Sequence, residues 1–347
     1  METVWFVIVV LMMGVYVVLD GFDIGVGIVY LWVAKSAEER QAALTSIGPV
    51  WDGNEVWLIA AGGVLFMAFP DVYASAFSGF YLALFILLWL LIGRGLALEL
   101  RHHVDDPLWR SFWDGVFSLC SLLLALVLGA ALGNVLRGVP LDANGDFFTP
   151  LWTNFLTGPQ PGILDWYTVL VGLLAVMVLA VHGTNYLALR TAGMMQQRAH
   201  QISGLACKAL LPLSLFSVIV TPLVQPLLAD RLNTHPAGYL LLLLAALALG
   251  GLFYFGKNGR NLAAFASSKL LILGLLGTAA FALYPNLLIS SANPAGNLTI
   301  FNSAASLYGL RVALVWWLIG LILVCIYMAF VYRSFWGTVE VTAGEGY

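Results

Sequence analysis

Charged residues are scarce in this sequence. Asp, Glu, Lys and Arg make up 10% of its 347 residues, hydrophobic residues make up 61%, and the mean hydropathy is +0.93. Soluble proteins carry roughly 25% charged residues, so the composition excludes an ordinary soluble domain. It predicts an all-α, polytopic membrane helix bundle, because helices satisfy their own backbone hydrogen bonds inside lipid.

Cysteines and known catalytic motifs are also few. Cys120, Cys207 and Cys325 are odd in number and lie in apolar runs, so neither a disulfide framework nor a Cys metal site is indicated. The sequence contains no P-loop, nucleophile elbow, HExxH or CxxCH motif. It has no basic stripe for nucleic acid either. We therefore expect no metal ligated by this chain and no nucleic-acid partner.

Long apolar runs fill most of the chain. A spanning helix needs about 20 mainly apolar residues, and this rule predicts nine segments within a single transmembrane domain, 1–347. They are 4–31, 52–69, 75–98, 113–134, 164–189, 203–229, 237–255, 262–284 and 309–332. The N-terminus lacks the basic residues of a signal peptide, so we expect the first segment to be retained.

Lysine and arginine are distributed unevenly across this topology. Twelve of the fifteen fall on one side, and only Arg137, Arg231 and Arg311 fall on the other. Membrane proteins keep basic residues on the cytoplasmic side. The bias predicts that the N-terminus lies outside and the C-terminus lies in the cytoplasm.

Two acids lie inside the first span. At 1.5 Å per residue, Asp20 is roughly 22 Å and Asp23 roughly 27 Å from the outer start of the helix, and a spacing of three places both on one face. Ionisable groups at such depth are costly and usually functional. One interpretation is a protonated, paired or hydrated acid in a proton pathway. The other is a hydrogen-bonded packing motif with Gly21 and Gly25.

The second span opens with a polar stretch between two tryptophans. Asp52 lies at the inner rim and Glu55 about one turn deeper on the same face, with Trp51, Asn54 and Trp57 in supporting positions. Asp52 could simply be an N-cap, and the tryptophans could be interfacial residues. Capping does not explain Glu55, so we favour a proton-handling role for these acids.

The fifth span supplies a third polar group at similar depth. His182 lies roughly 24 Å from the outer end, and Asn185 follows one turn later; both are candidates for a polar relay. Residues 182–185 also echo 20–23 as polar-Gly-x-polar. This suggests repeats over 1–134 and 164–284 with 309–332 as an additional helix. A lone buried histidine is more often a packing residue than a haem ligand.

Other charged residues in or near the spans have routine interpretations. We expect Arg94, Lys208 and Lys269 to snorkel toward the cytoplasmic helix ends, and Arg110 to pair with Asp114 at a helical spacing of four. From these features alone, a proton-coupled secondary transporter would fit, because it too combines intramembrane acids, glycine breaks and repeats.

Three motifs in one order carry a resemblance to a known family. They are LDGFDIGVGI at 19–28, WDGNEVWLI at 51–59 followed by AAGG, and FSGFY at 77–81. Together with nine spans in this orientation, they resemble subunit II of the cytochrome bd quinol oxidases. Beyond the first hundred residues the resemblance rests on segment layout and on short matches after the fifth span.

The resemblance implies a bacterial cytoplasmic (inner) membrane and a complex with a homologous subunit I. That subunit binds two b-type haems and one d-type haem, oxidises quinol and reduces oxygen to water. Subunit II ligates no haem in this family; it serves as a pseudo-symmetric scaffold, holds a quinone in some members, and contributes a cytoplasmic proton path at the position of Asp52. Glutamine replaces Glu55 in some members. A small single-helix third subunit accompanies some complexes, and lipids surround them.

Overall fold

The computed structural model describes residues 1–142, 144–292 and 294–339. The α-helices are α1 (Glu2–Val33), α2 (Ala37–Ile47), α3 (Trp51–Ala68), α4 (Pro70–Gly79), α5 (Tyr81–Leu100), α6 (Pro107–Arg137), α7 (Trp166–Arg190), α8 (Gly193–Val224), α9 (Pro226–Thr234), α10 (Tyr239–Lys257), α11 (Asn261–Leu283) and α12 (Leu307–Ser334). Two 3-10 turns, η1 (Pro236–Gly238) and η2 (Pro294–Gly296), accompany them, and β1 (Asn286–Leu288) pairs antiparallel with β2 (Leu298–Thr299).

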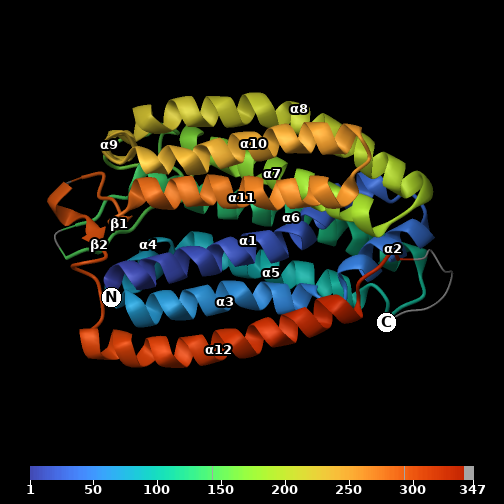
Figure 1. Ribbon diagram of the computed structural model, residues 1–347, viewed down its shortest axis with the longest axis horizontal. Helices are drawn as coiled ribbons and strands as arrows, with labels where there is room; N and C mark the ends of the chain where they lie inside the picture. Colours follow the sequence, from blue (N-terminus) through green and yellow to red (C-terminus); the bar gives the residue numbers. More distant parts are fainter. Residues whose placement is uncertain (143, 293, 340–347) are drawn as a thin grey trace.

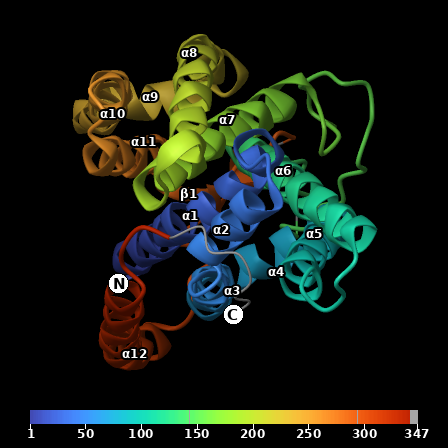
Figure 2. The same cartoon turned by 90° about the vertical axis from the view of Figure 1, so that its right-hand side faces the viewer.

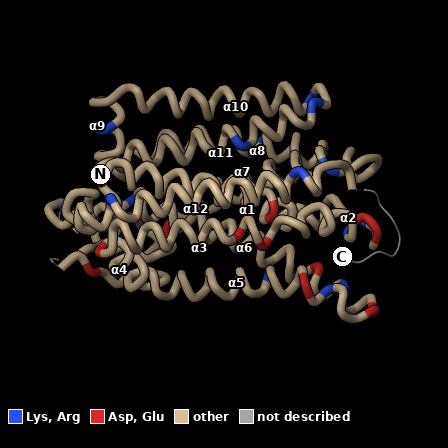
Figure 3. The backbone as a smooth tube through the Cα atoms, turned by 60° about the horizontal axis from the view of Figure 1, so that its bottom comes forward, with Lys and Arg blue, Asp and Glu red and all other residues tan. Residues whose placement is uncertain are grey.

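The long helices lie side by side along one axis (Figure 1). The N-terminus, α4, α9 and the β1–β2 hairpin gather at one end, which we call the β end. Helix α2 and the turns before α6 and α11 lie at the other, which we call the α2 end. Charged residues concentrate toward the two ends, most densely at the α2 end, and a few lie inside the bundle (Figure 3).

The expected all-α membrane bundle is confirmed. Eight described helices are long and apolar enough to cross a membrane. The remaining predicted segment, 52–69, corresponds to α3, which has 18 residues and lies alongside the others (Figure 1). Its hydropathy is reduced by Asp52, Asn54 and Glu55. The count of about nine spans therefore agrees approximately with the structure.

Some boundaries differ from the predicted spans. The predicted segment 75–98 is divided at Phe80 into α4 and α5. The segment 203–229 begins earlier, at Gly193, and ends before Pro226, which starts α9. Hydropathy reports only the part of a helix that lies in lipid, so polar turns at 193–202 were left out. Helix α2 was also missed; it opens with a capping box between Ser36 and Glu39.

Seen along the bundle axis, α1, α3, α5 and α6 lie on one side and α7, α8, α10 and α11 on the other (Figure 2). In the first group, α1 packs on α3 and α6, and α5 packs on α6. In the second, α7 packs on α8 and α11, and α10 packs on α11. The three contacts named for the first group have counterparts in the second, but α8 also packs on α10, whereas no comparable contact joins α3 to α5 among the described residues. The duplication itself remains a prediction.

The two groups meet where α1 crosses α7. A Cβ atom at Gly25 would lie 2.0 Å from the Leu179 carbonyl oxygen, and one at Gly183 would lie 2.1 Å from the Gly25 carbonyl carbon. A Cβ at Gly21 would be 3.0 Å from the Leu179 side chain. Small residues permit such close backbone approach in membrane bundles. The crossing sets α7 directly against the polar turn of α1.

Helix α12 lies at the margin, beside α1 and α3 (Figure 2). Large side chains bridge the distance. The Trp5 indole donates to the Leu310 carbonyl at 3.1 Å, and the rings of Trp5 and Trp317 meet edge to face at 6.4 Å. Near its other end, the Tyr332 hydroxyl donates to the side-chain oxygen of Asn54 at 2.8 Å. The additional helix therefore reaches the polar residues of α3.

Candidate functional site

A buried ion pair joins α1 to α5. Arg94 and Asp20 are both fully buried; Arg94 Nη2 lies 2.5 Å from Asp20 Oδ1, and Nη1 lies 3.1 Å from Oδ2. The same Nη2 atom lies 3.3 Å from Glu55 Oε2 on α3. Bidentate arginine–carboxylate pairs are strong and geometrically specific. Three helices are thereby fixed to one guanidinium group.

The prediction that Arg94 snorkels is wrong. Its side chain has no exposed surface, because a carboxylate of α1 lies within reach at the same depth. The neighbouring glycines allow other helices to pack closely against α5: Gly93 faces the Cys120 sulfur of α6, and Gly95 faces the Trp51 ring of α3. An arginine flanked by two glycines in an apolar run was the signal that could have identified the pair.

A second branch of the site starts from Asp23. Asn54 donates from Nδ2 to Asp23 Oδ2 at 2.7 Å and accepts the hydrogen bond from Tyr332 of α12. Asp23 is 1% exposed, and among the described residues its other oxygen, Oδ1, has no hydrogen-bond partner. Sequence reasoning missed Tyr332, because nothing in its spacing links the last helix to the first.

The cluster contains more acids than cations. Arg94 contacts Asp20 and half-buried Glu55, and Asp23 lies one turn from Asp20 on α1; among the described residues, Arg94 is the cation that pairs with these acids. An unpaired carboxylate away from water is strongly destabilised. At least one of these acids must therefore carry a proton or reach water, and the arrangement is suited to holding and releasing protons.

The remaining residues of the polar stretch on α3 lie closer to the α2 end. Asp52 is exposed in the first helical turn, and the N-cap is Val50, without a side-chain cap. The interpretation of Asp52 as an N-cap is therefore wrong. Trp51 packs against the backbone of α5, and Trp57 is buried. From Asp52, the next acid inward on the same face is Glu55.

His182 and Asn185 form a separate, neutral group. His182 is fully buried; its Nδ1 atom lies 2.7 Å from Ser268 Oγ and its Nε2 atom 2.9 Å from the Val18 carbonyl oxygen. Asn185 donates to Ser203 at 3.0 Å. No hydrogen bond between described residues joins this pair to the acids around Arg94.

His182 is not placed as a free haem ligand. Both ring nitrogens of His182, the histidine inside a predicted span, are engaged by Ser268 and Val18. Among the described residues, no group of three His, Cys, Asp or Glu side chains is placed to hold a metal ion. We derive no step through a metal at this site.

Two further ion networks were missed by sequence reasoning. At the α2 end, Asp114 accepts from Tyr30 at 2.7 Å, Arg101 at 2.6 Å and Arg40 at 3.0 Å. The expected pairing of Asp114 with Arg110 is therefore wrong; Arg110 lies 2.7 Å from Asp105 instead. Asp114 is buried and tied to α1 and α2, so its partners come from other segments rather than its own helix.

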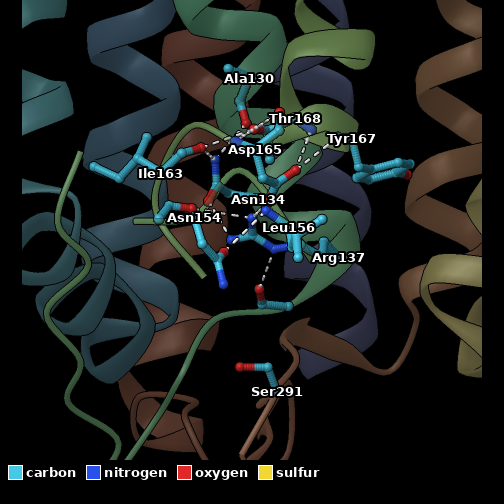
Figure 4. Close-up of polar contacts among 12 residues, drawn as sticks. Ala130, Asn134, Arg137, Asn154, Leu156, Ile163, Asp165, Tyr167, Thr168 and Ser291 are labelled. Carbon is cyan, nitrogen blue, oxygen red and sulfur yellow. Dashed lines mark hydrogen bonds and ion pairs between the residues drawn. The ribbon is translucent and has the colours of Figure 1, made fainter. Parts of the chain in front are cut away.

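The second missed network closes the β end (Figure 4). Arg137, at the end of α6, forms an ion pair with the buried Asp165 and donates to Asn134 Oδ1 at 2.7 Å. Asp165 also caps α7 by accepting from the amides of Tyr167 and Thr168. This network fixes α6 to α7 and contains one acid per cation.

An ion pair outside the spans links α2 to α8. Glu39 pairs with Arg198, which also donates to the Val33 carbonyl oxygen at 2.8 Å. Partial burial raises the pKa of the Glu39 carboxyl, but hydrogen bonds from the Lys35 amide and from Arg198 outweigh it and lower the pKa below its usual value. Glu39 is therefore held in its charged form.

Comparison with known proteins identifies relatives over the full chain. The family model described as cytochrome bd terminal oxidase subunit II matches residues 1–335. A probable cytochrome oxidase subunit 2 of Haemophilus influenzae is 31% identical, covering 97% of this chain and 94% of the relative. The cytochrome bd ubiquinol oxidase subunit 2 of Bacillus subtilis is 30% identical, covering 90% of this chain and 89% of the relative.

A solved structure shows the same fold. The bd oxidase from Geobacillus thermodenitrificans contains a chain that superposes with a TM-score of 0.71 at 18% identity, covering 96% of this chain and 98% of that one. None of these comparisons supports the alternative of a secondary transporter. With a family model matched over residues 1–335, this chain belongs to the cytochrome bd terminal oxidase subunit II family.

Proposed function

We propose that this chain is the subunit of a quinol:oxygen oxidoreductase that scaffolds a haem-bearing subunit I and supplies it with protons. The relative from Bacillus subtilis is named as a ubiquinol oxidase subunit. The haems, two b-type and one d-type, belong in the partner, because His182 is fully engaged in hydrogen bonds. A quinone bound by this subunit and a small single-helix third subunit are proposed from the family resemblance alone.

In this proposal the chain lies in the bacterial cytoplasmic membrane with the α2 end inside. Twelve of its fifteen basic residues belong to the side predicted to be cytoplasmic. Protons for oxygen reduction would then enter at the α2 end, where Asp52 is exposed. The N-terminus and the β end would face outward.

The observation that carries the proton role is the excess of acids around Arg94. Asp52 at the rim, Glu55 one turn deeper and the buried pair Asp20 and Asp23 form an inward series of carboxyl groups. Arg94 pairs with the Asp20 carboxylate and compensates its charge. The remaining carboxyl groups can therefore exchange a proton while this ion pair stays intact. Asp52 would take protons from the cytoplasm, with Glu55, Asp20 and Asp23 as relay neighbours.

The test is Asp52→Asn in the assembled complex. Proton uptake and quinol-dependent oxygen consumption should fall by about tenfold or more, because general acid–base steps contribute roughly 10² to 10⁴ in rate. Haem content and subunit ratio should stay unchanged. Asp71→Asn is the matched control, since Asp71 is also an exposed acid in the first turn of a helix but lies at the β end.

Three outcomes would count against the proposal. Unchanged oxygen consumption and proton uptake in Asp52→Asn would remove Asp52 from the path. A colourless chain that purifies without a haem-bearing partner would contradict the oxidase assignment itself. Equal losses in Asp52→Asn and Asp71→Asn would indicate a general loss of integrity and would also count against a proton route at the α2 end.

A further inference from the structure

Acids and cations are divided between the two halves of the chain. Residues 1–165 contain fifteen acids and six cations, whereas residues 166–334 contain one acid, Asp230, and nine cations. The net charges of these two stretches are −9 and +8. Glu340 and Glu345, which follow them in the sequence, bring the whole chain to −3. These two parts of the chain therefore differ sharply in charge.

Three of the four cations at the α2 end of the first half are paired within the protein. Arg40 and Arg101 both contact Asp114, and Arg110 contacts Asp105. Such pairing leaves little attraction for an external anion. Lys35 is the exception; it is exposed and its Nζ atom donates to the Leu31 carbonyl oxygen.

Arg198 of the second half is paired with Glu39, but three other cations at the same end have no such compensation within the part of the chain that the structure describes. Lys208 on α8, Lys257 at the end of α10 and Arg260 just before α11 are all exposed, and α8, α10 and α11 contain no Asp or Glu. No ion pair to any of the three is found among the described residues. These three residues are called the basic rim below.

The basic rim lies at one level of the bundle. Measured from the β ends of their helices, Lys208 is about 24 Å along α8 and Lys257 about 27 Å along α10, and these two helices pack together. In a hydrocarbon core of about 30 Å, this level is the boundary with the headgroups. Arg260 follows in the turn after α10.

Apolar side chains continue from the basic rim toward the middle of the bundle. Leu211 is exposed one turn from Lys208, and Phe253 and Tyr254 are exposed one turn from Lys257. A ligand on this face would therefore meet cations at one end and hydrocarbon along its length. A free phosphate or a soluble acidic peptide would use only the first of these features.

We propose that the basic rim binds the headgroup of an anionic phospholipid, whose acyl chains lie along α8 and α10. Cations near a membrane surface attract anionic lipid by an amount that corresponds to about fivefold in affinity for each Lys or Arg. The phosphate occupies the rim, where no protein acid competes for it. The lipid covers the face of the second half that faces away from α1.

The test compares two double variants of the full complex in phosphatidylcholine nanodiscs with and without added phosphatidylglycerol. Native mass spectrometry measures the phosphatidylglycerol retained after detergent extraction. Lys208→Gln with Lys257→Gln should weaken retention by about 25-fold, as two cations are lost. The matched control, Arg40→Gln with Arg110→Gln, removes two cations at the same end that are paired with Asp114 and Asp105, and should leave retention unchanged.

Raising the salt concentration should release the lipid from the wild-type complex, since exposed charges are screened beyond about 10 Å at 0.1 M. Equal loss in both double variants would overturn the proposal, and so would wild-type retention of phosphatidylcholine and phosphatidylglycerol in equal amounts. A soluble partner bound at the rim instead would appear as protein mass in the same spectra and would count against a lipid. The readout is lipid mass, so failure here leaves the proposed proton route intact.

Discussion

The polar turns of α1 and α7 occupy matching places in the two halves but are built differently. On α1, Asp20 and Asp23 are charged or protonatable and depend on Arg94 and Asn54 from other helices. On α7, His182 is closed by neutral partners, Ser268 and Val18. One polar-Gly-x-polar pattern thus supports an ionisable cluster in the first half and a neutral hydrogen-bonded lock in the second.

The difference lies in what each turn requires of its neighbours. Buried charges need an opposite charge at close range, whereas neutral polar groups need only a hydrogen-bond partner. The first half is therefore the more sensitive to loss of a single cation. The second half can lose polar groups at lower cost and leaves its own cations free to meet lipid.

The largest effect is expected when Arg94 is replaced. Arg94→Gln leaves Asp20 without its bidentate partner and should destabilise the complex by about 3–5 kcal/mol. Thermal unfolding in detergent and the yield of assembled complex measure the loss. Adding Asp20→Asn should recover much of it, because the uncompensated charge is then removed. A single variant as stable as wild type would contradict the ion-pair role.

The joint between the halves should be nearly as sensitive. Gly25→Ala places a Cβ atom 2.0 Å from the Leu179 carbonyl oxygen, so α1 and α7 must separate, at a cost of about 1–3 kcal/mol or more. Gly62→Ala is the control, since a Cβ there meets no atom within 4 Å. The melting temperatures of the two variants should differ clearly; similar values would show that the crossing tolerates separation.

Removing the neutral lock should have a moderate effect. His182→Leu leaves the Ser268 hydroxyl without its imidazole partner and should cost about 1–3 kcal/mol. The haem absorption spectrum of the complex should not change, because His182 is not a ligand. Loss of a haem band in a folded variant would contradict that interpretation. The polar turn of α7 would then have a functional role, as is proposed for the polar turn of α1.

The smallest effect is expected at the link between α2 and α8. Glu39→Gln removes the ion pair with Arg198 and should cost about 1 kcal/mol or less, as both side chains are partly exposed. Because folding lowers the pKa of Glu39, its contribution is complete at neutral pH and is lost as the pH falls below the usual value of 4.5. Thermal melts across pH 3–7 should show a smaller decline in Glu39→Gln than in wild type, whereas Glu99→Gln, at an exposed acid with no ion pair among the described residues, should behave as wild type.

Hydropathy was sufficient to predict the class of fold, because length and apolarity alone define a membrane span. It could not predict α2, whose residues remain at the surface, nor the polar start of α8. Element ends outside lipid are determined by caps such as Ser36 and by prolines such as Pro226. These signals are local and weaker than a long apolar run.

For the site, the sequence located the acids but not their partners. Asp20, Asp23 and Glu55 were singled out because charge is rare in the spans. Arg94 was misinterpreted, since its distance from the predicted helix end allowed it to reach water. The hydrogen bond from Tyr332 to Asn54 depends on how α12 packs against α3. Residue spacing within one helix gives no information about that packing. The predicted spans contained more acids than cations assigned to their interior. This excess could have indicated that an arginine is buried beside the acids.

The separation of Asp20 from Arg94 along the chain has a consequence for biosynthesis. The two residues are 74 positions apart, and the helix with the acids is made first. At about 5–20 residues per second, α1 waits roughly 4–15 s before its cation emerges from the ribosome. During that interval Asp20 must be held neutral or kept wet by the insertion machinery. The synthesis of α5 is therefore the step that allows the Asp20–Arg94 ion pair to form and α1 to reach its final position in the membrane.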